Sequence, residues 1–138
     1  MENPTHLLNL AADNIRTLAV SMVERAKSGH PGGAMGGADF IIVHFGEFLT
    51  FDPERPTWEC RDRFFLDPGH MSPMLYAQLA LIGRYSIEEL MSFRQWGAAT
   101  PGHTEVNFEG GFEITRGPLG LGQTFAVGEA IAAKALYA

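Results

Sequence analysis

Three of the five histidines in the sequence follow a glycine directly and lie in segments that we predict to be loops. They are His30 in SGHP, His70 in PGHM and His103 in PGHT. Loops carry a large share of the binding and catalytic residues of proteins. A neutral imidazole donates one hydrogen bond and accepts another, which suits a small ligand with hydroxyl and carbonyl groups. We therefore predict that these histidines bind such a ligand and transfer protons.

Two other interpretations of the histidines stay open from the residues alone. Each also fits an ordinary turn residue without a function. Metal binding has little support, because no two histidines stand four residues apart and the HExxH pattern is absent. The remaining histidines, His6 and His44, lie in predicted helices, and we interpret them as surface or core residues.

The segment RGPLGLGQ, residues 116–123, precedes a predicted helix. Glycines at such a point leave backbone N–H groups and the positive end of the helix dipole open to a ligand, which favours phosphate. The segment matches neither the GxxxxGK(S/T) phosphate loop nor the GxGxxG dinucleotide pattern. An ordinary helix start that contains glycines is the alternative interpretation.

A second glycine-rich segment, SGHPGGAMGG, covers residues 28–37 and contains five glycines. A glycine inside an ordered element costs about 0.5–1 kcal/mol of stability relative to alanine. The density of glycines here therefore predicts that the backbone approaches another group closely.

Helices must position these residues, and apolar periodicity and capping signals predict where they lie. The predicted helices cover residues 5–27, 38–49, 72–82, 87–95 and 119 to the C-terminus. Ser72 is the expected N-cap of the third helix, with Pro73 in its first turn. Ser86 and Glu89 form a capping box for the fourth helix. A long loop is predicted over residues 96–118.

The apolar segment RFFLD, residues 63–67, predicts one buried strand of the kind found in parallel sheets. Helices around such a strand indicate an α/β fold, in which one strand alone cannot complete the sheet. The chain contains no dividing linker, and its last predicted helix reaches the C-terminus without a stop signal. We therefore expect part of a larger domain.

The composition narrows the class of protein. The 138 residues are 46% hydrophobic, which is enough for a core, and the formal net charge is -6. An acidic chain does not bind nucleic acid or an anionic membrane through bulk electrostatics. The single cysteine, Cys60, supports neither a disulfide framework nor a thiolate zinc site and favours a reducing compartment. The sequence contains no signal-peptide pattern and no apolar run long enough to span a membrane.

Four motifs resemble, in order and spacing, the N-terminal region of transketolases. They are SGHPGGAMGGADF, RDRFFLDPGHMSPMLY, FRQW followed by TPGHTEV, and GPLGLGQTFAVGEAIAAK. The resemblance runs from about residue 12 to the C-terminus. The sequence departs from the common family pattern at Pro68 in place of asparagine, at Thr104 in place of proline and at Leu121 in place of glutamine. None of these departures removes a histidine.

The resemblance implies a fold and a reaction. Transketolases are cytoplasmic homodimers with thiamine diphosphate at the subunit interface. This region would be the start of their diphosphate-binding domain, a doubly wound parallel α/β unit that is helix-rich in this segment. The family transfers a two-carbon ketol unit from a ketose phosphate to an aldose phosphate in the pentose phosphate pathway. The cofactor acts as an electron sink, and the protein orients substrates and transfers protons.

Carried over residue by residue, the resemblance assigns His30 and His103 to catalysis and to the substrate hydroxyls near the reacting carbon. His70 would lie beside both the substrate and the cofactor diphosphate. The segment that would touch the aminopyrimidine and pack on the cofactor rings consists of Gly117, Pro118 and Leu119.

The same resemblance places the ligands of Mg²⁺ or Ca²⁺ after residue 138, so no metal ligand is assigned in this sequence. Residues 1–138 would be an N-terminal part of the diphosphate-binding domain and would not turn over alone. Sugar phosphates would be the substrates, and a second transketolase subunit or complementary chain the partner. The alternatives are a related thiamine enzyme, of the dihydroxyacetone synthase or deoxyxylulose-phosphate synthase type, and a non-catalytic subunit that binds a partner chain.

Overall fold

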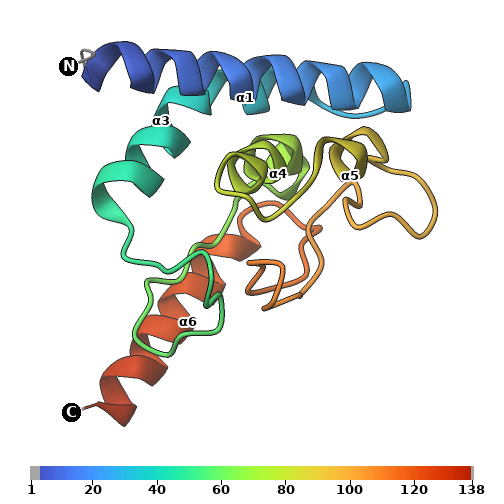
Figure 1. The fold of residues 1–138 in the computed structure, drawn as a ribbon. Coiled ribbons are helices and arrows are strands. Elements are labelled where there is room, and N and C mark those ends of the chain that lie inside the picture. The colour runs from blue at the N-terminus through green and yellow to red at the C-terminus, as the bar shows by residue number, and fades with distance from the viewer. Residues whose placement is uncertain (1–3, 138) are drawn as a thin grey trace.

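The structure of the chain, a computed structural model, describes residues 4–137 and consists of helices joined by irregular loops (Figure 1). The helices are α1 (Pro4–Ala26), α2 (Pro31–Gly36), α3 (Ala38–Val43), α4 (Ser72–Leu81), α5 (Ile87–Met91) and α6 (Leu121–Leu136). A π-helical turn, His44–Phe48, continues α3, and a 3-10 turn, Gly69–Met71, leads into α4. Within residues 4–137, none of the helices combines the length and the apolar character needed to cross a membrane.

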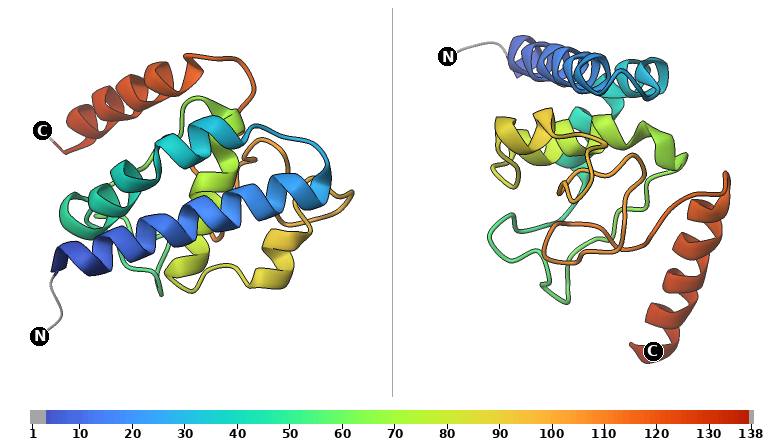
Figure 2. Two further views of the ribbon diagram at one scale, coloured as in Figure 1. Left: turned by 90° about the horizontal axis from the view of Figure 1, so that it is seen from above. Right: turned by 90° about the vertical axis from the view of Figure 1, so that its right-hand side faces the viewer.

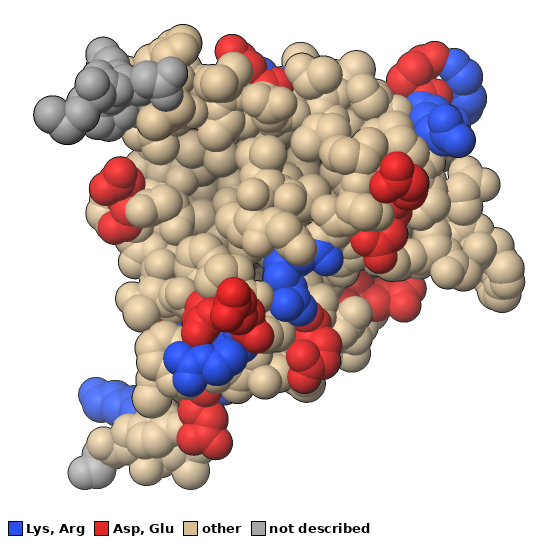
Figure 3. Space-filling model, in the orientation of Figure 1, with Lys and Arg blue, Asp and Glu red and all other residues tan. Residues whose placement is uncertain are grey.

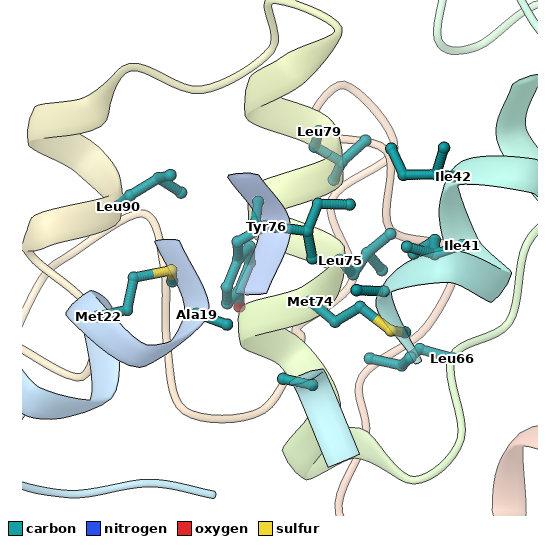
Figure 4. Packing of buried hydrophobic residues seen from close by; sticks show 14 of the residues in the cluster. Ala19, Met22, Ile41, Ile42, Leu66, Met74, Leu75, Tyr76, Leu79 and Leu90 are labelled. Atoms are coloured by element: carbon teal, nitrogen blue, oxygen red, sulfur yellow. The ribbon is translucent and has the colours of Figure 1, made fainter. Parts of the chain in front are cut away.

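The helix α4 lies at the centre of the structure, and α1 lies across it (Figure 1). Every residue from Ser72 to Leu79 is buried, so this part of α4 has no side facing solvent. The helix α1 turns one apolar stripe toward it, in which Ile15, Ala19 and Met22 are fully buried. Figure 4 shows Tyr76 in the middle of this packing, close to Ala19. The two helices therefore form the core that supports the loops around them.

The helix α6 stands apart from the other helices (Figure 2). Among the described elements it packs against no other helix, and Gly122 is its only buried residue within Leu121–Leu136. Its apolar side chains consequently stay exposed, namely Phe125, Val127, Ile131 and Leu136.

The helices predicted from periodicity are confirmed with small shifts at their ends. The capping box of α5 is present: the Ser86 hydroxyl accepts the Glu89 N–H at 3.1 Å, and the Glu89 carboxylate accepts the Ser86 N–H at 2.8 Å. This helix ends at Met91, before the predicted end at residue 95, and Arg94 adopts a left-handed φ of 62° in the turn beyond it. The last helix begins at Leu121 rather than at residue 119.

The strand predicted over residues 63–67 is wrong. The segment has no partner strand, and within residues 4–137 the only β pairing is an isolated bridge between Asn107 and Phe112. Its apolar side chains pack against the helical core instead, where Leu66 is buried. An apolar run predicts burial, but a strand also requires a hydrogen-bonding neighbour. The described residues thus form a helix-rich unit without the parallel sheet of the expected α/β fold.

One prediction about a helix start is also wrong. Ser72 is the first residue of α4 and Met71 is its N-cap. The Ser72 hydroxyl donates to the carbonyl oxygen of Gly102 at 2.7 Å, so it ties a distant loop to the helix. His30 lies in a loop, as predicted, and is the N-cap of α2, with Pro31 in the first turn.

Candidate functional site

The rings of His30 and His70 lie against each other although 39 residues separate them in the sequence. His30 ends the connection after α1 and caps α2, while His70 lies in the 3-10 turn before α4. Their ring centroids are 4.6 Å apart, and the rings are tilted by 44°. The packing of α2 against α4 brings these two helix starts together.

His103 completes the cluster from the long loop between α5 and α6. Its ring carbon Cδ2 lies only 3.0 Å from the point that a Cβ on Gly69 would occupy. Gly69 directly precedes His70, so this close approach places His103 beside the turn that holds His70. The three histidines that the sequence singles out are therefore neighbours in space.

Three side-chain hydrogen bonds fasten the loop that carries His103. The Tyr76 hydroxyl donates to the carbonyl oxygen of Pro101 at 2.9 Å. The Ser72 hydroxyl donates to that of Gly102 at 2.7 Å, and the Thr100 hydroxyl donates to that of Glu89 at 2.9 Å. Tyr76, Ser72 and Thr100 are all fully buried. The buried helices thus hold residues 100–102 in place and so fix the position of the adjacent His103.

The surroundings of His103 lower its pKa from the ordinary value. Burial contributes most, because it disfavours the charged imidazolium, and the charges of Arg94, His70 and His30 follow in that order. His103 is therefore neutral at pH 7. In this form one ring nitrogen donates a hydrogen bond and the other accepts one, as a proton-transferring group requires.

The glycines after His30 do allow close packing, as the sequence predicts, but at only some positions. A Cβ on Gly33 would lie 2.9 Å from Met71 Cγ, and one on Gly37 would lie 2.6 Å from Met74 Sδ. A Cβ on Gly36 would meet nothing within 4 Å. The glycines that face α4 let α2 and the start of α3 approach it, which sets the position of His30.

The segment Gly117–Leu119 lies next to the same turn. Arg116, the residue before it, has its Cβ 2.9 Å from the point that a Cβ on Gly69 would occupy. At the other end of the segment, the N–H of Gly120 donates to Asp67 Oδ1 at 3.3 Å. The segment itself is exposed, and the Leu119 side chain has 71% of its surface open to solvent.

Two arginines belong to this neighbourhood although the sequence analysis does not single them out. Arg94 donates to the Ser28 hydroxyl and lowers the pKa of His103. Arg116 is 5% exposed and stands directly before Gly117. A surface groove beside His103 is lined in part by Ser28, Arg94, His103, Glu105 and Arg116. The residue type alone carries no signal that would have distinguished these arginines from surface ones.

The described residues contain no group of three or more His, Cys, Asp or Glu side chains placed to hold a metal ion. The three clustered histidines do not form such a group either. Cys60 is a free, exposed thiol. The arrangement can bind and orient a polar ligand and move protons, through imidazoles and a buried guanidinium.

Known proteins are similar to this chain in sequence and in structure. Residues 8–138 match the family described as transketolase, thiamine diphosphate binding domain. The transketolase of Halalkalibacterium halodurans is 48% identical over 134 residues, which cover 96% of this chain and 20% of that protein. Transketolase 1 of Escherichia coli is 49% identical over 92% of this chain and 19% of its own length.

Solved structures agree with the sequence matches. The transketolase of Campylobacter jejuni superposes with a TM-score of 0.87 at 43% identity, over 97% of this chain and 21% of that one. The transketolase of Leishmania mexicana gives a TM-score of 0.86 at 42% identity, over 91% of this chain and 19% of its own. The chain spans about a fifth of the length of these relatives. By its sequence and its fold, the chain belongs to the transketolase family and corresponds to part of the thiamine diphosphate-binding domain.

Proposed function

We propose that the protein containing this chain is a transketolase, which transfers a two-carbon ketol unit from a ketose phosphate to an aldose phosphate in the pentose phosphate pathway. The observation that carries the proposal is the convergence of His30, His70 and His103 from three different connections. A thiamine enzyme of the dihydroxyacetone synthase or deoxyxylulose-phosphate synthase type is the related alternative. Transketolase structures of Pichia stipitis that resemble this chain contain fructose 6-phosphate, sedoheptulose 7-phosphate or xylulose 5-phosphate.

The residues present fit thiamine diphosphate. The guanidinium of Arg116 is buried without a hydrogen-bond partner, which suits an anionic group nearby, and the exposed backbone of Gly117 and Pro118 leads to an exposed apolar side chain, Leu119. When bound, thiamine diphosphate supplies a nucleophilic carbon and an electron sink. In this proposal His70 lies beside the diphosphate, and Gly117, Pro118 and Leu119 contact the cofactor rings.

The histidines would act on the sugar. His30 is exposed at the N-cap of α2, and His103 is partly exposed beside it, so both can reach hydroxyl groups of a bound substrate. His103, neutral at pH 7 because its pKa is lowered, can accept a hydroxyl proton and return it. His30 and His70 would hold the hydroxyl groups and orient the carbonyl for reaction.

The same proposal extends to the parts of the protein outside this chain. The exposed apolar face of α6 supports a domain in which further residues supply a parallel sheet against this helix, as in a doubly wound α/β fold. The ligands for Mg²⁺ or Ca²⁺ would come from those residues. The full protein would act in the cytoplasm as a homodimer, with the second subunit completing the cofactor site.

Ketol transfer by the full-length protein tests this function, with xylulose 5-phosphate as the donor and thiamine diphosphate present. Positioned acid–base groups contribute roughly 10²–10⁴-fold to rate, so His30→Ala and His103→Ala should each lower turnover by about a hundredfold or more. His6→Ala, at an exposed position of α1, is the matched control and should retain the wild-type rate.

Each possible failure has its own meaning. A wild-type protein that binds thiamine diphosphate but transfers no ketol unit contradicts the proposed reaction. Wild-type rates in His30→Ala and His103→Ala contradict the roles of these residues and leave the reaction itself in place. Circular dichroism of the variants shows whether a lost rate reflects lost folding.

A further inference from the structure

Arg116 is a buried cation without a partner for its charged end. The residue is 5% exposed, and both terminal nitrogens, Nη1 and Nη2, are buried without a hydrogen bond in the structure. Its backbone N–H, by contrast, donates to the carbonyl oxygen of Thr104 at 2.9 Å. A buried guanidinium that donates no hydrogen bond is costly, so the position calls for an acceptor.

The guanidinium lies alongside the first turn of α6. A Cβ on Gly122 would overlap Nη1 and would lie 2.6 Å from Cζ of Arg116, so only glycine leaves room for it. The helix that begins here has 16 residues, and its N-cap, Gly120, makes no side-chain cap. The positive end of the helix dipole therefore faces the same space as the arginine. Two positive groups at one point make a setting that favours an anion.

Asp67 is the acidic side chain whose charge acts on Arg116, but it accepts no hydrogen bond from the guanidinium. Its Oδ1 accepts the N–H of Gly120 at 3.3 Å, and its charge raises the pKa of Arg116 against the larger lowering by burial. Among the described residues Asp67 and Arg116 form no ion pair. The donors of the guanidinium thus stay available to a second anionic group.

We infer that Arg116 and the N-terminal turn of α6 form an oxyanion site that takes a phosphate group. The planar fork of an arginine matches two phosphate oxygens at once, and the free N–H groups of a helix start bind phosphate in many proteins. Arg116 Cβ and His103 Cδ2 lie 2.9 Å and 3.0 Å from the same point, the one that a Cβ on Gly69 would occupy, so the phosphate would lie at the edge of the histidine cluster. This inference rests on the proposed function, in which the phosphate comes from thiamine diphosphate or from the sugar phosphate.

Calorimetric titration of the full-length protein with inorganic diphosphate, without any turnover, tests the site. Arg116→Gln should weaken diphosphate binding about tenfold to a hundredfold, which is the range for a charged hydrogen bond. Arg116→Lys keeps the charge without the fork and should give an intermediate affinity. Arg55→Gln removes the same charge from an exposed loop side chain and should bind like the wild type.

Two further arms identify the source of the phosphate. If the cofactor supplies it, Arg116→Gln weakens binding of thiamine diphosphate and leaves that of xylulose 5-phosphate unchanged. If the substrate supplies it, the reverse holds. Unchanged affinity for diphosphate, thiamine diphosphate and xylulose 5-phosphate would overturn the inference.

A second variant and a stability measurement show whether Arg116→Gln loses binding because the protein unfolds or because the guanidinium is gone. Gly122→Ala keeps the arginine but displaces its guanidinium, so it should also weaken diphosphate binding. Without ligand, Arg116→Gln should unfold at the wild-type temperature or above, because it removes an unpaired buried charge. A lower unfolding temperature with unchanged diphosphate binding would mean a structural ion pair elsewhere in the protein and would overturn the site. Ketol transfer by the wild type stays a separate test, since it reports on the reaction and not on Arg116.

Discussion

His103 owes its neutral form to its neighbours as well as to its own chemistry. Burial is the largest cause of its lowered pKa, and Arg94 is the largest single charge that adds to it. Arg94 reaches this position from a turn with a left-handed φ of 62°, and a hydrogen bond to the Ser28 hydroxyl holds it there. We therefore treat Arg94 as a residue that sets the protonation state of His103.

We expect Arg94→Gln to raise the pKa of His103, because the substitution removes a positive charge that disfavours the imidazolium. The measurement is a pH titration of the imidazole NMR signals in full-length protein labelled at histidine. Arg55→Gln, which removes a charge that does not act on His103, should leave the titration unchanged. A His103 pKa that stays the same in Arg94→Gln would remove Arg94 from this role.

The lowered pKa also fixes the sign of one pH effect on stability. Histidine in an unfolded chain titrates near about 6.5, and the folded state binds a proton at His103 less readily than that. Between the two pKa values the unfolded state holds more protons, so the contribution of His103 to stability falls as the pH drops below about 6.5. The loss ends once the pH is below the pKa of the folded state.

At this scale the sequence predicts the histidines but not the arginines. Three glycine–histidine pairs in one short chain are visible in the sequence; the rings of His30 and His70 meet, and His103 lies beside Gly69. Arg94 and Arg116 gain their importance from burial and from a close approach to Gly102, Gly69 and Gly122. The contacts of Arg116 with Gly69 and of Arg94 with Ser28 join segments far apart in the chain, so a local pattern cannot reveal them.

At the scale of elements, the contact between α2 and α4 sets the distance between His30 and His70. A Cβ on Gly37 would come within 2.6 Å of Met74 Sδ and within 3.0 Å of Met71 Cε. One on Gly36 would meet nothing within 4 Å. Neighbouring glycines of one turn thus differ in what they do, and this difference can be measured.

Gly37→Ala should lower the free energy of unfolding by about 1–3 kcal/mol, the usual effect of overpacking a core. Gly36→Ala should leave it unchanged or raise it by up to about 1 kcal/mol, since alanine restricts the unfolded chain more than glycine does. Urea unfolding of the full-length protein, followed by far-UV circular dichroism, compares the two variants. Equal stabilities would show that Met71 and Met74 move aside without penalty.

Elements whose signals are local are predicted well, and those that need a distant partner are not. The periodicity of α1 and the capping box of Ser86 depend on neighbours within one or two turns, and both are confirmed. The segment 63–67 is apolar and buried in part, but no described segment pairs with it, so it forms no strand. Ser72 was expected to cap its own helix, and its hydroxyl bonds to the distant Gly102 instead.

At the scale of the whole molecule, α6 is the part with least support. Val127 is 59% exposed and Ile131 is 65% exposed, although both belong to an apolar helix. Figure 3 shows acidic and basic side chains interspersed over one face of the molecule, with wide uncharged areas between them. The exposed apolar side chains of α6 favour association.

Residues 1–138 expressed alone should therefore self-associate or aggregate. Sedimentation velocity should detect species larger than a monomer, and a double variant with Val127→Glu and Ile131→Glu should shift the distribution toward the monomer. Ile87→Glu, at a 52% exposed position of α5, introduces one such charge away from α6 and should not shift the distribution. A soluble monomer of the unmodified segment would argue against this view of α6.

The three buried hydroxyl groups that hold residues 100–102 affect how quickly a ligand can bind beside them. Residues 100–102 lose their conformational freedom when the polypeptide folds, not when a ligand binds. The protein segment therefore does not have to become ordered on binding, and the entropy lost on binding is mainly that of the ligand. Diffusion of the ligand to the groove, rather than the closing of a loop, should therefore govern the rate of binding beside residues 100–102.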